Sequence, residues 1–259
     1  MNYRCESLCY NHSTAVLGED SERYTDKKRT MKNLKSTLLA FLVALGLAEG
    51  IQAQDWPNLK EFQEANQKLG TPAADVDRVV FMGNSITIGW LNKRPEFFEG
   101  KPYVNRGISG QTTPQMLIRF RQDVVDLKPK VVVILAGTND IAGNTGPSTL
   151  EMIADNIKSM AEIAHANGIK VVLSSTLPAF DYPWKPGMEP APKIIELNKM
   201  IKAYAEEKGH IYLDYFSAMA DDRNGLPKKY ADDEVHPTVA GYKVMEPLVE
   251  KAIEEGLKK

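Results

Sequence analysis

The fold is decided by the stretch Arg78-Val-Val-Phe-Met-Gly-Asn-Ser-Ile-Thr-Ile-Gly-Trp90. It opens with an apolar run over residues 79–82, which is typical of a strand buried on both faces. The run breaks at Gly83 and then presents Asn84 and Ser85. Ligands of open α/β sheets bind beyond the carboxyl ends of the strands, so Ser85 is a candidate nucleophile. Taken alone, Ser85 is better explained as the cap of the next helix.

Apolar runs alternate with helical patterns along the rest of the chain. Strands are expected over residues 78–83, 103–109, 131–135, 170–175 and 211–215. Helices are expected over 58–69, 114–127, 148–167, 193–208 and 237–253, with a short one from Ser85 towards Leu91. This βαβ pattern predicts a three-layer α/β/α fold around a five-stranded parallel sheet. The flavodoxin-like order 2-1-3-4-5 would place Ser85 at the switch point beside the first strand.

Composition limits the class of partner. The chain has 259 residues, of which 43% are hydrophobic and 25% charged, with a net charge of −2. These values are ordinary for a globular protein with one sizeable core. Lys and Arg are scattered along the chain, so neither nucleic acid nor an anionic membrane surface is indicated as a partner.

The N-terminal part has the pattern of a processed segment. Residues 31–53 combine a basic start, an apolar run of about ten residues and a small residue at Ala53, as in a secretory signal peptide. The apolar run is too short to span a membrane comfortably. Residues 1–30 form an unpatterned leader upstream, so Met31 is a candidate for the true start. We expect an exported domain over 54–259, with no stable membrane insertion after cleavage.

Both cysteines, Cys5 and Cys9, lie in the leader. The mature chain would therefore carry no disulfide, no thiolate metal site and no cysteine nucleophile.

Specialised residues follow four of the expected strands. They are Gly-Asn-Ser-Ile-Thr (83–87), Gly-Ile-Ser-Gly (107–110), Gly-Thr-Asn-Asp (137–140) and Asp-Glu-Val-His-Pro (233–237). A serine nucleophile needs a base, an acid that orients the base, and donors for the oxyanion. The four segments supply each of these roles.

Elimination selects the base among four histidines. His12 lies in the leader, His165 near the end of a helix, and His210 at the opposite, amino edge of the sheet. Only His236 lies at the edge expected for Ser85, although a residue before Pro237 is also a common turn position. Asp233 is three residues earlier, so one short turn can bring its carboxylate to the imidazole; Asp232 is a less favourably spaced rival.

At these residues the chain resembles the SGNH/GDSL hydrolases, which are serine esterases and acylhydrolases on a flavodoxin-like sheet. The resemblance covers nearly all of residues 54–259. Residues 83–87 look like the block that carries the nucleophile, and 233–237 like the block with acid and base. The resemblance implies an oxyanion hole formed by the amides of Ser85 and Gly110 and the side chain of Asn139. Asn84 departs from the family pattern, which has Asp before the nucleophile.

Other classes fit less well. The order Ser, Asp, His also suits an α/β-hydrolase, but Thr87 stands where the second glycine of G-x-S-x-G belongs. Phosphate-loop and dinucleotide motifs are absent from the sequence. A metal hydrolase is disfavoured by the single well-placed histidine. A non-catalytic glycan-binding relative is disfavoured by the complete Ser, Asp and His set.

We therefore expect an ester hydrolase that needs no cofactor and no metal. An acetylated carbohydrate is the leading substrate, and a lysophospholipid or other lipid ester is the alternative. The proline-rich segment 178–192 contains Phe180, Tyr182 and Trp184, which are expected to line the alcohol side of the pocket. The same aromatic residues also suit simple packing of a stiff loop.

Overall fold

The computed structural model describes residues 27–29, 31–32 and 54–259. The chain divides into two compact units, Met1–Gln54 and Asp55–Lys259. Of the first unit, only positions 27–29, 31–32 and 54 are described, and 27–29 and 31–32 are helical. The expected leader and signal peptide therefore lie almost wholly outside the described residues.

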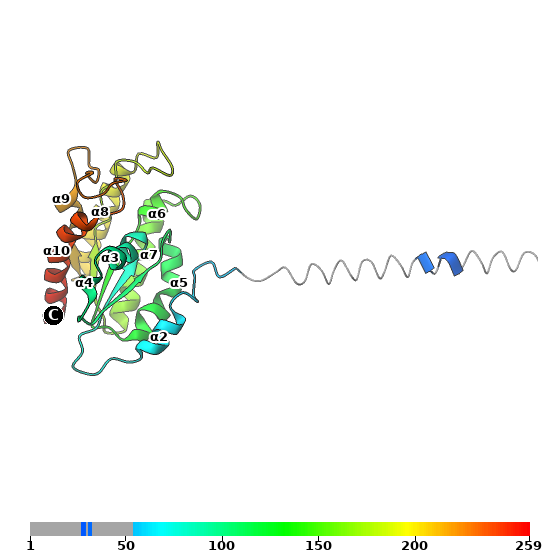
Figure 1. Cartoon of the computed structure of the whole chain (residues 1–259), viewed down its shortest axis with the longest axis horizontal. Helices are drawn as coiled ribbons and strands as arrows, with labels where there is room; N and C mark the ends of the chain where they lie inside the picture. Colours follow the sequence, from blue (N-terminus) through cyan, green and yellow to red (C-terminus); the bar gives the residue numbers. More distant parts are fainter. Residues whose placement is uncertain (1–26, 30, 33–53) are drawn as a thin grey trace, which may run out of the picture. The chain divides into compact units, whose positions relative to one another are not determined.

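The second unit alternates strands and helices (Figure 1). Its strands are β1 (Val79–Gly83), β2 (Tyr103–Gly107), β3 (Val131–Leu135), β4 (Lys170–Ser174) and β5 (Ile211–Leu213). Its helices are α2 (Gln63–Leu69), α3 (Ser85–Lys93), α4 (Pro95–Phe98), α5 (Thr113–Asp123), η1 (Val125–Leu127), α6 (Thr138–Ile141), α7 (Leu150–Ala166), α8 (Pro190–Lys208), α9 (Tyr215–Met219) and α10 (Val239–Lys258).

The strands form one parallel sheet in the order β2-β1-β3-β4-β5. This confirms the predicted fold class and strand order. Gly83 at the end of β1 is in register with Gly107 of β2 and Leu135 of β3. The segments that follow these three strands therefore leave the sheet side by side at its carboxyl edge.

Alternate residues of the strands bury their side chains in two separate cores. Val80 and Met82 of β1 pack with α5, α7 and α8 on one face. Val79 and Phe81 pack with α3, α4, α9 and α10 on the other face. Both faces of the sheet are covered, which explains why the strands read as continuous apolar runs.

Two glycines let α3 approach the sheet closely. A Cβ atom at Gly83 would overlap the hydroxyl of Thr87, and one at Gly107 would overlap the backbone nitrogen of Ile88. Glycine at both positions allows the first turns of α3 to rest directly on the ends of β1 and β2.

Some element boundaries differ from the sequence prediction. Helix α2 begins at Gln63 rather than at residue 58, because the Asp55 carboxylate accepts from the amides of Leu59 and Lys60 and holds this part in turns. Strand β5 ends at Leu213, because the next residue, Asp214, caps α9. Helix α8 begins three residues before the predicted position 193, at Pro190.

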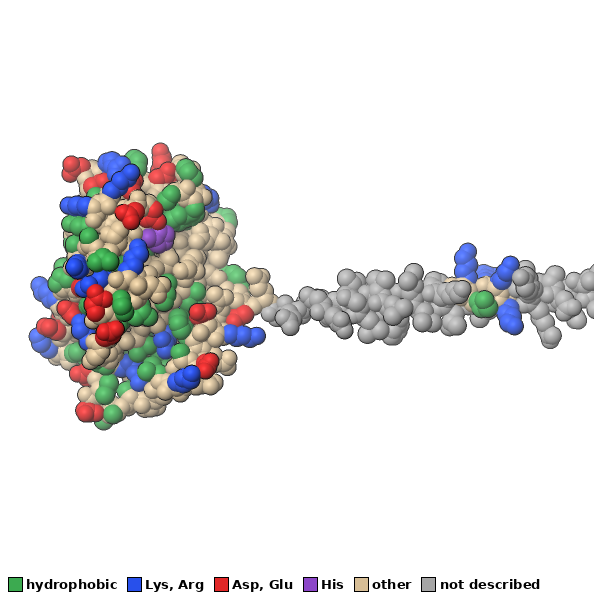
Figure 2. Space-filling model, viewed as in Figure 1, with side chains coloured by type: hydrophobic (Ala, Val, Ile, Leu, Met, Phe, Trp, Pro, Cys, Tyr) green, Lys and Arg blue, Asp and Glu red, His purple; other side chains and the backbone are tan. Residues whose placement is uncertain are grey.

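On the face of the molecule seen in Figure 2, acidic and basic side chains are interspersed, and histidine atoms reach the surface. In residues 54–259 and the few described residues before them, no helix has the length and apolarity needed to cross a bilayer.

Candidate active site

Ser85 is the first residue of α3, directly beyond β1. Its hydroxyl oxygen lies 3.0 Å from Nε2 of His236. The helix is capped by Asn84, whose side-chain oxygen accepts from the amide of Ile86 at 3.0 Å. Capping needs only an acceptor oxygen, so Asn serves here as Asp would. The cap role considered for Ser85 belongs to its neighbour, and the Ser85 hydroxyl faces the imidazole.

His236 is held by Asp233. Its Nδ1 lies 2.7 Å from Oδ2 of Asp233, while Oδ1 of the same carboxylate accepts from the backbone amides of Val235 and His236 at 3.0 and 2.7 Å. Asp233 therefore both shapes the turn and orients the ring. This geometry selects Asp233 over Asp232 as the partner of the imidazole.

The charge on Asp233 suits this arrangement. Partial burial raises its pKa, but the hydrogen bonds from His236 and Val235 lower it more, so the pKa lies below its ordinary value. The group is a carboxylate at neutral pH and accepts the proton on Nδ1. When Nδ1 donates to this carboxylate, Nε2 faces the Ser85 hydroxyl as an acceptor, as a general base requires.

The expected oxyanion donors follow β1, β2 and β3. Ser85 opens a helix, so its amide has no acceptor within that helix. Gly110 has a φ of +75°, a left-handed conformation that favours glycine. Nδ2 of Asn139 donates to the carbonyl oxygen of Gln111 at 2.9 Å, which leaves the second hydrogen of that amide group for a ligand. Sequence reasoning missed Gln111, although it directly follows Gly110.

Polar contacts tie the loop after α6 to the loop after β2. Nδ2 of Asn144 donates to the carbonyl of Gly110 at 3.1 Å. The hydroxyls of Thr112 and Thr145 lie 2.9 Å apart. The segments that carry Gly110 and Asn139 are thus joined by hydrogen bonds.

Asp140, next to Asn139, is a buried acid of α6 that contacts the first residue of α5. Its carboxylate accepts from the backbone amide of Thr113 at 2.9 and 3.1 Å and from the Thr113 hydroxyl at 2.6 Å. Burial raises its pKa from 3.8 to about 6, against the opposing effect of these hydrogen bonds. The contact fixes α6, which carries Asn139, to the N-terminus of α5, where a negative charge is favourable.

The raised pKa of Asp140 gives stability a definite pH dependence. Between pH 3.8 and about 6 the folded protein retains a proton that the unfolded chain has lost. The contribution of this group to stability therefore falls as the pH rises through that range. We expect Asp140→Asn to make the melting temperature fall less over this range than in the wild type, measured by calorimetry. An unchanged pH slope in the variant would show that Asp140 titrates normally in the folded protein.

The aromatic segment differs in part from its prediction. Trp184 is 45% exposed, and its ring centroid lies 5.8 Å from that of His236. Phe180 is also exposed, and it packs against the guanidinium of Arg223. Tyr182, predicted to line the pocket, is fully buried, and its hydroxyl lies 3.0 Å from that of Thr138.

The burial of Tyr182 corrects its predicted role. Its ring stacks under that of Trp184 at 5.0 Å and 23°, so it supports the exposed ring and does not meet substrate itself. Asp181 causes this fold of the loop, because its carboxylate accepts from the amides of Tyr182, Gly187 and Met188. The sequence signal that could have indicated the turn was an acidic residue before a run dense in proline and glycine.

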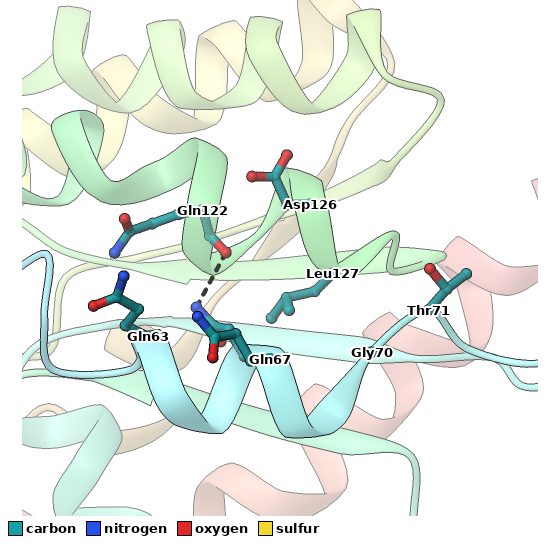
Figure 3. Close-up of a pocket in the computed structure, with 8 residues that line it drawn as sticks. Gln63, Gln67, Gly70, Thr71, Gln122, Asp126 and Leu127 are labelled. Carbon is teal, nitrogen blue, oxygen red and sulfur yellow. Dashed lines mark hydrogen bonds between the residues drawn. The ribbon is translucent and has the colours of Figure 1, made fainter.

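A separate pocket of about 400 Å³ lies between α2 and the α5–η1 region (Figure 3). Ser85, Asp233 and His236 are not among the residues that line it. Gln63, Gln67, Gln122 and Asp126 line it, and the side chain of Asn66 donates to the carbonyl of Gln122 at 3.1 Å. The lining includes no nucleophile–base pair. Within the described part of the chain, no group of three or more His, Cys, Asp or Glu residues is placed to hold a metal ion.

Comparison with known families shows where this chain belongs. The model of the GDSL-like lipase/acylhydrolase family matches residues 81–244. The chain belongs to this family. The match spans the segments with Ser85, Gly110, Asn139 and His236, as the resemblance in sequence predicted. Members of the GDSL-like family are carboxylic ester hydrolases.

Individual relatives include a solved structure and two esterases. A solved structure from Bacteroides fragilis, described as an acylhydrolase, is 48% identical, with a TM-score of 0.77, over 79% of this chain and 99% of its own. Esterase TesA of Pseudomonas aeruginosa is 30% identical over 186 residues, 66% of this chain and 85% of its own length. An acetylxylan esterase of Xylanibacter ruminicola is 27% identical over 224 residues, 72% of this chain but 45% of its own. The chain thus matches less than half the length of that esterase.

Proposed function

We propose that the protein hydrolyses carboxylic esters through Ser85, His236 and Asp233. The observation that carries this proposal is the continuous chain of contacts from Ser85 Oγ to His236 Nε2 at 3.0 Å and from His236 Nδ1 to Asp233 at 2.7 Å. These distances are those of a nucleophile with its base and of a base with its orienting acid.

In the proposed reaction, Ser85 Oγ attacks the ester carbonyl while Nε2 of His236 takes its proton. The negative oxygen that forms is held by the amides of Ser85 and Gly110 and by the Asn139 side chain. The protonated His236 then donates to the leaving alkoxide, which departs as the alcohol. A water molecule, deprotonated by His236, attacks the acyl-enzyme; His236 then returns the proton to Ser85 Oγ as the carboxylic acid is released.

We propose an acetylated carbohydrate as the substrate. The exposed face of Trp184 beside His236 supports this, because a flat aromatic surface suits the apolar face of a sugar ring and His236 marks the side from which the alcohol leaves. The acetylxylan esterase among the relatives supports it too. Lipid esters are the second candidate.

The experiment that tests the proposed function is a series of acyl esters of one alcohol. Asn144 bonds to Gly110 and Thr112 to Thr145, so the loops beside the proposed oxyanion donors carry polar side chains. A longer acyl chain therefore has little apolar surface to bury against, although each buried methylene can contribute about 0.8 kcal/mol. We expect kcat/KM to fall from acetyl through butyryl to octanoyl. A rise to eight carbons would favour the lipid-ester function, and hydrolysis of none of them would favour a non-catalytic glycan-binding protein.

Trp184→Ala tests the sugar contact. We expect kcat/KM for acetylated xylooligosaccharides to fall by roughly 3- to 10-fold, the scale of one aromatic stacking contact. The value for a small aryl acetate, which has no sugar ring to stack on Trp184, should fall less. Trp184→Phe keeps an aromatic face and should recover most of the loss. Equal losses on both substrates would instead mean that Trp184 positions His236.

We also propose that residues 31–53 act as a signal peptide and that the protein is exported. The basic, apolar and small-residue order of the sequence supports this. N-terminal sequencing of the mature protein should begin at Gln54; a mature N-terminus at Met1 would contradict it.

A further inference from the structure

Arg119 of α5 is completely buried and makes four hydrogen bonds. Nε donates to the side-chain oxygen of Gln111 at 2.5 Å, and Nη1 donates to Asp123 at 3.0 Å. Nη2 donates to two backbone carbonyls, those of Gly83 at 3.1 Å and Arg106 at 2.9 Å.

These acceptors lie where the candidate site is built. Gly83 is the last residue of β1, two residues before Ser85, and Arg106 lies one residue before the end of β2. Gln111 follows Gly110, and its backbone carbonyl accepts from Asn139. One rigid guanidinium therefore contacts, directly or through Gln111, the segments that carry Ser85, Gly110 and Asn139.

Stability alone is a weak explanation for this buried charge. Burial lowers the pKa of Arg119, and the negative charge of Asp123 opposes this effect. The other carboxylate oxygen of Asp123 accepts from the side chain of Asn66. A buried ion pair often stabilises a fold no more than apolar residues of similar volume do, because removing two charges from water costs so much. The guanidinium of an arginine is planar and presents its N–H donors in fixed directions, so it can hold several acceptors at set distances.

We propose that Arg119 is a positioning residue for the reaction: it fixes the ends of β1 and β2 and the Gly110–Gln111 segment so that the nucleophile and oxyanion donors meet in productive geometry. The proposal rests on the proposed esterase function and adds to it a residue that does not touch the substrate.

Arg78 offers a matched control. It is also buried, and its guanidinium donates to the backbone carbonyls of Leu127 at 2.7 Å, Gly70 at 2.8 Å and Leu69 at 3.4 Å. It directly precedes β1, so it fixes backbone at the amino end of the same strand, away from the site.

The test compares Arg119→Lys with Arg78→Lys in the full chain. Lysine keeps the positive charge, but its single ammonium group cannot reach all the acceptors that the guanidinium contacts. We expect Arg119→Lys to lower kcat for an aryl acetate by about 10- to 100-fold, the effect of a misplacement of up to about 1 Å. KM should stay within about twofold, since ground-state binding loses less than transition-state stabilisation. Arg78→Lys should lower the melting temperature and leave kcat unchanged.

A second measurement separates positioning from general weakening of the fold. A trifluoromethyl ketone adds to the serine and places its oxyanion among the same donors, so its inhibition constant should rise in parallel with the loss of kcat/KM in Arg119→Lys. If Arg119→Lys does not fold, Gln111→Met replaces it, because this change cuts the Arg119–Gln111 link without leaving an unpaired charge. The same pattern of lower kcat at constant KM is expected.

The outcomes separate this inference from the proposed function. A folded Arg119→Lys, or in its place Gln111→Met, with wild-type kcat and ketone affinity would overturn the positioning role while the wild-type esterase activity stands. If the wild type hydrolyses no ester, the proposed function fails, and the positioning role fails with it.

Discussion

Ser85→Ala lowers kcat for ester hydrolysis by about 10⁴- to 10⁶-fold, the range expected when a serine nucleophile is removed. Alanine cannot form the acyl-enzyme, and His236, which lies 3.0 Å from the hydroxyl, has no proton to accept. Steady-state kinetics on an aryl acetate measure the effect. Folding should persist, because the helix cap is the Asn84 side chain and not Ser85.

Ser174→Ala is the matched control for this prediction. Ser174 ends β4, and among the described residues its buried hydroxyl has no hydrogen-bond partner. Its removal should leave kcat, KM and the melting temperature close to wild type. Near-wild-type activity in Ser85→Ala would show that another group is the nucleophile.

Asp233→Asn lowers kcat by about 10⁴-fold, as loss of the orienting acid does in serine hydrolases. The asparagine Oδ1 can still accept from the amides of Val235 and His236, so the turn remains. Its NH₂ group now faces Nδ1 of His236, which favours the tautomer with the proton on Nε2. That tautomer cannot take the proton of Ser85.

Asp232→Asn, on the neighbouring exposed carboxylate, controls for the loss of one negative charge near the site. It should retain wild-type kinetics, and circular dichroism should show both variants folded. Comparable losses in the two variants would mean that the local charge, and not the geometry of Asp233, supports catalysis.

The sequence predicted the sheet and its order because apolar runs, and their alternation with helical patterns, can be seen in the sequence itself. The apolar character of Val79 to Met82 can be recognised without knowing their neighbours in space. The helices that connect the strands leave few alternatives for the strand order. The carboxyl edge follows from the topology, which is why Ser85, His236 and Asp233 could be selected together from distant segments. The structure brings these three side chains into contact.

Other features depend on tertiary contacts that no local pattern contains. Tyr182 and Trp184 are both aromatic residues of one loop, yet tertiary contacts, the bonds of the Asp181 carboxylate and that of the Tyr182 hydroxyl with Thr138, go with the inward turn of Tyr182 alone. Arg119 lies in an ordinary amphipathic helix, and its role becomes visible only when Gly83, Arg106 and Gln111 meet around it. The end of β5 likewise depends on a side chain, Asp214, which starts α9.

The most direct test of the central claim is mass spectrometry of the protein after reaction with an organophosphate ester, followed by peptide mapping. Such a reagent phosphorylates a serine that an adjacent base activates, at a site whose donors stabilise the negative oxygen of the group under attack. We predict stoichiometric labelling of Ser85 that parallels the loss of esterase activity. Ser85→Ala should take up no label, and Asp233→Asn should be labelled slowly. Complete inactivation with Ser85 unlabelled, or with the label on another residue, would contradict the assignment of Ser85 as the nucleophile.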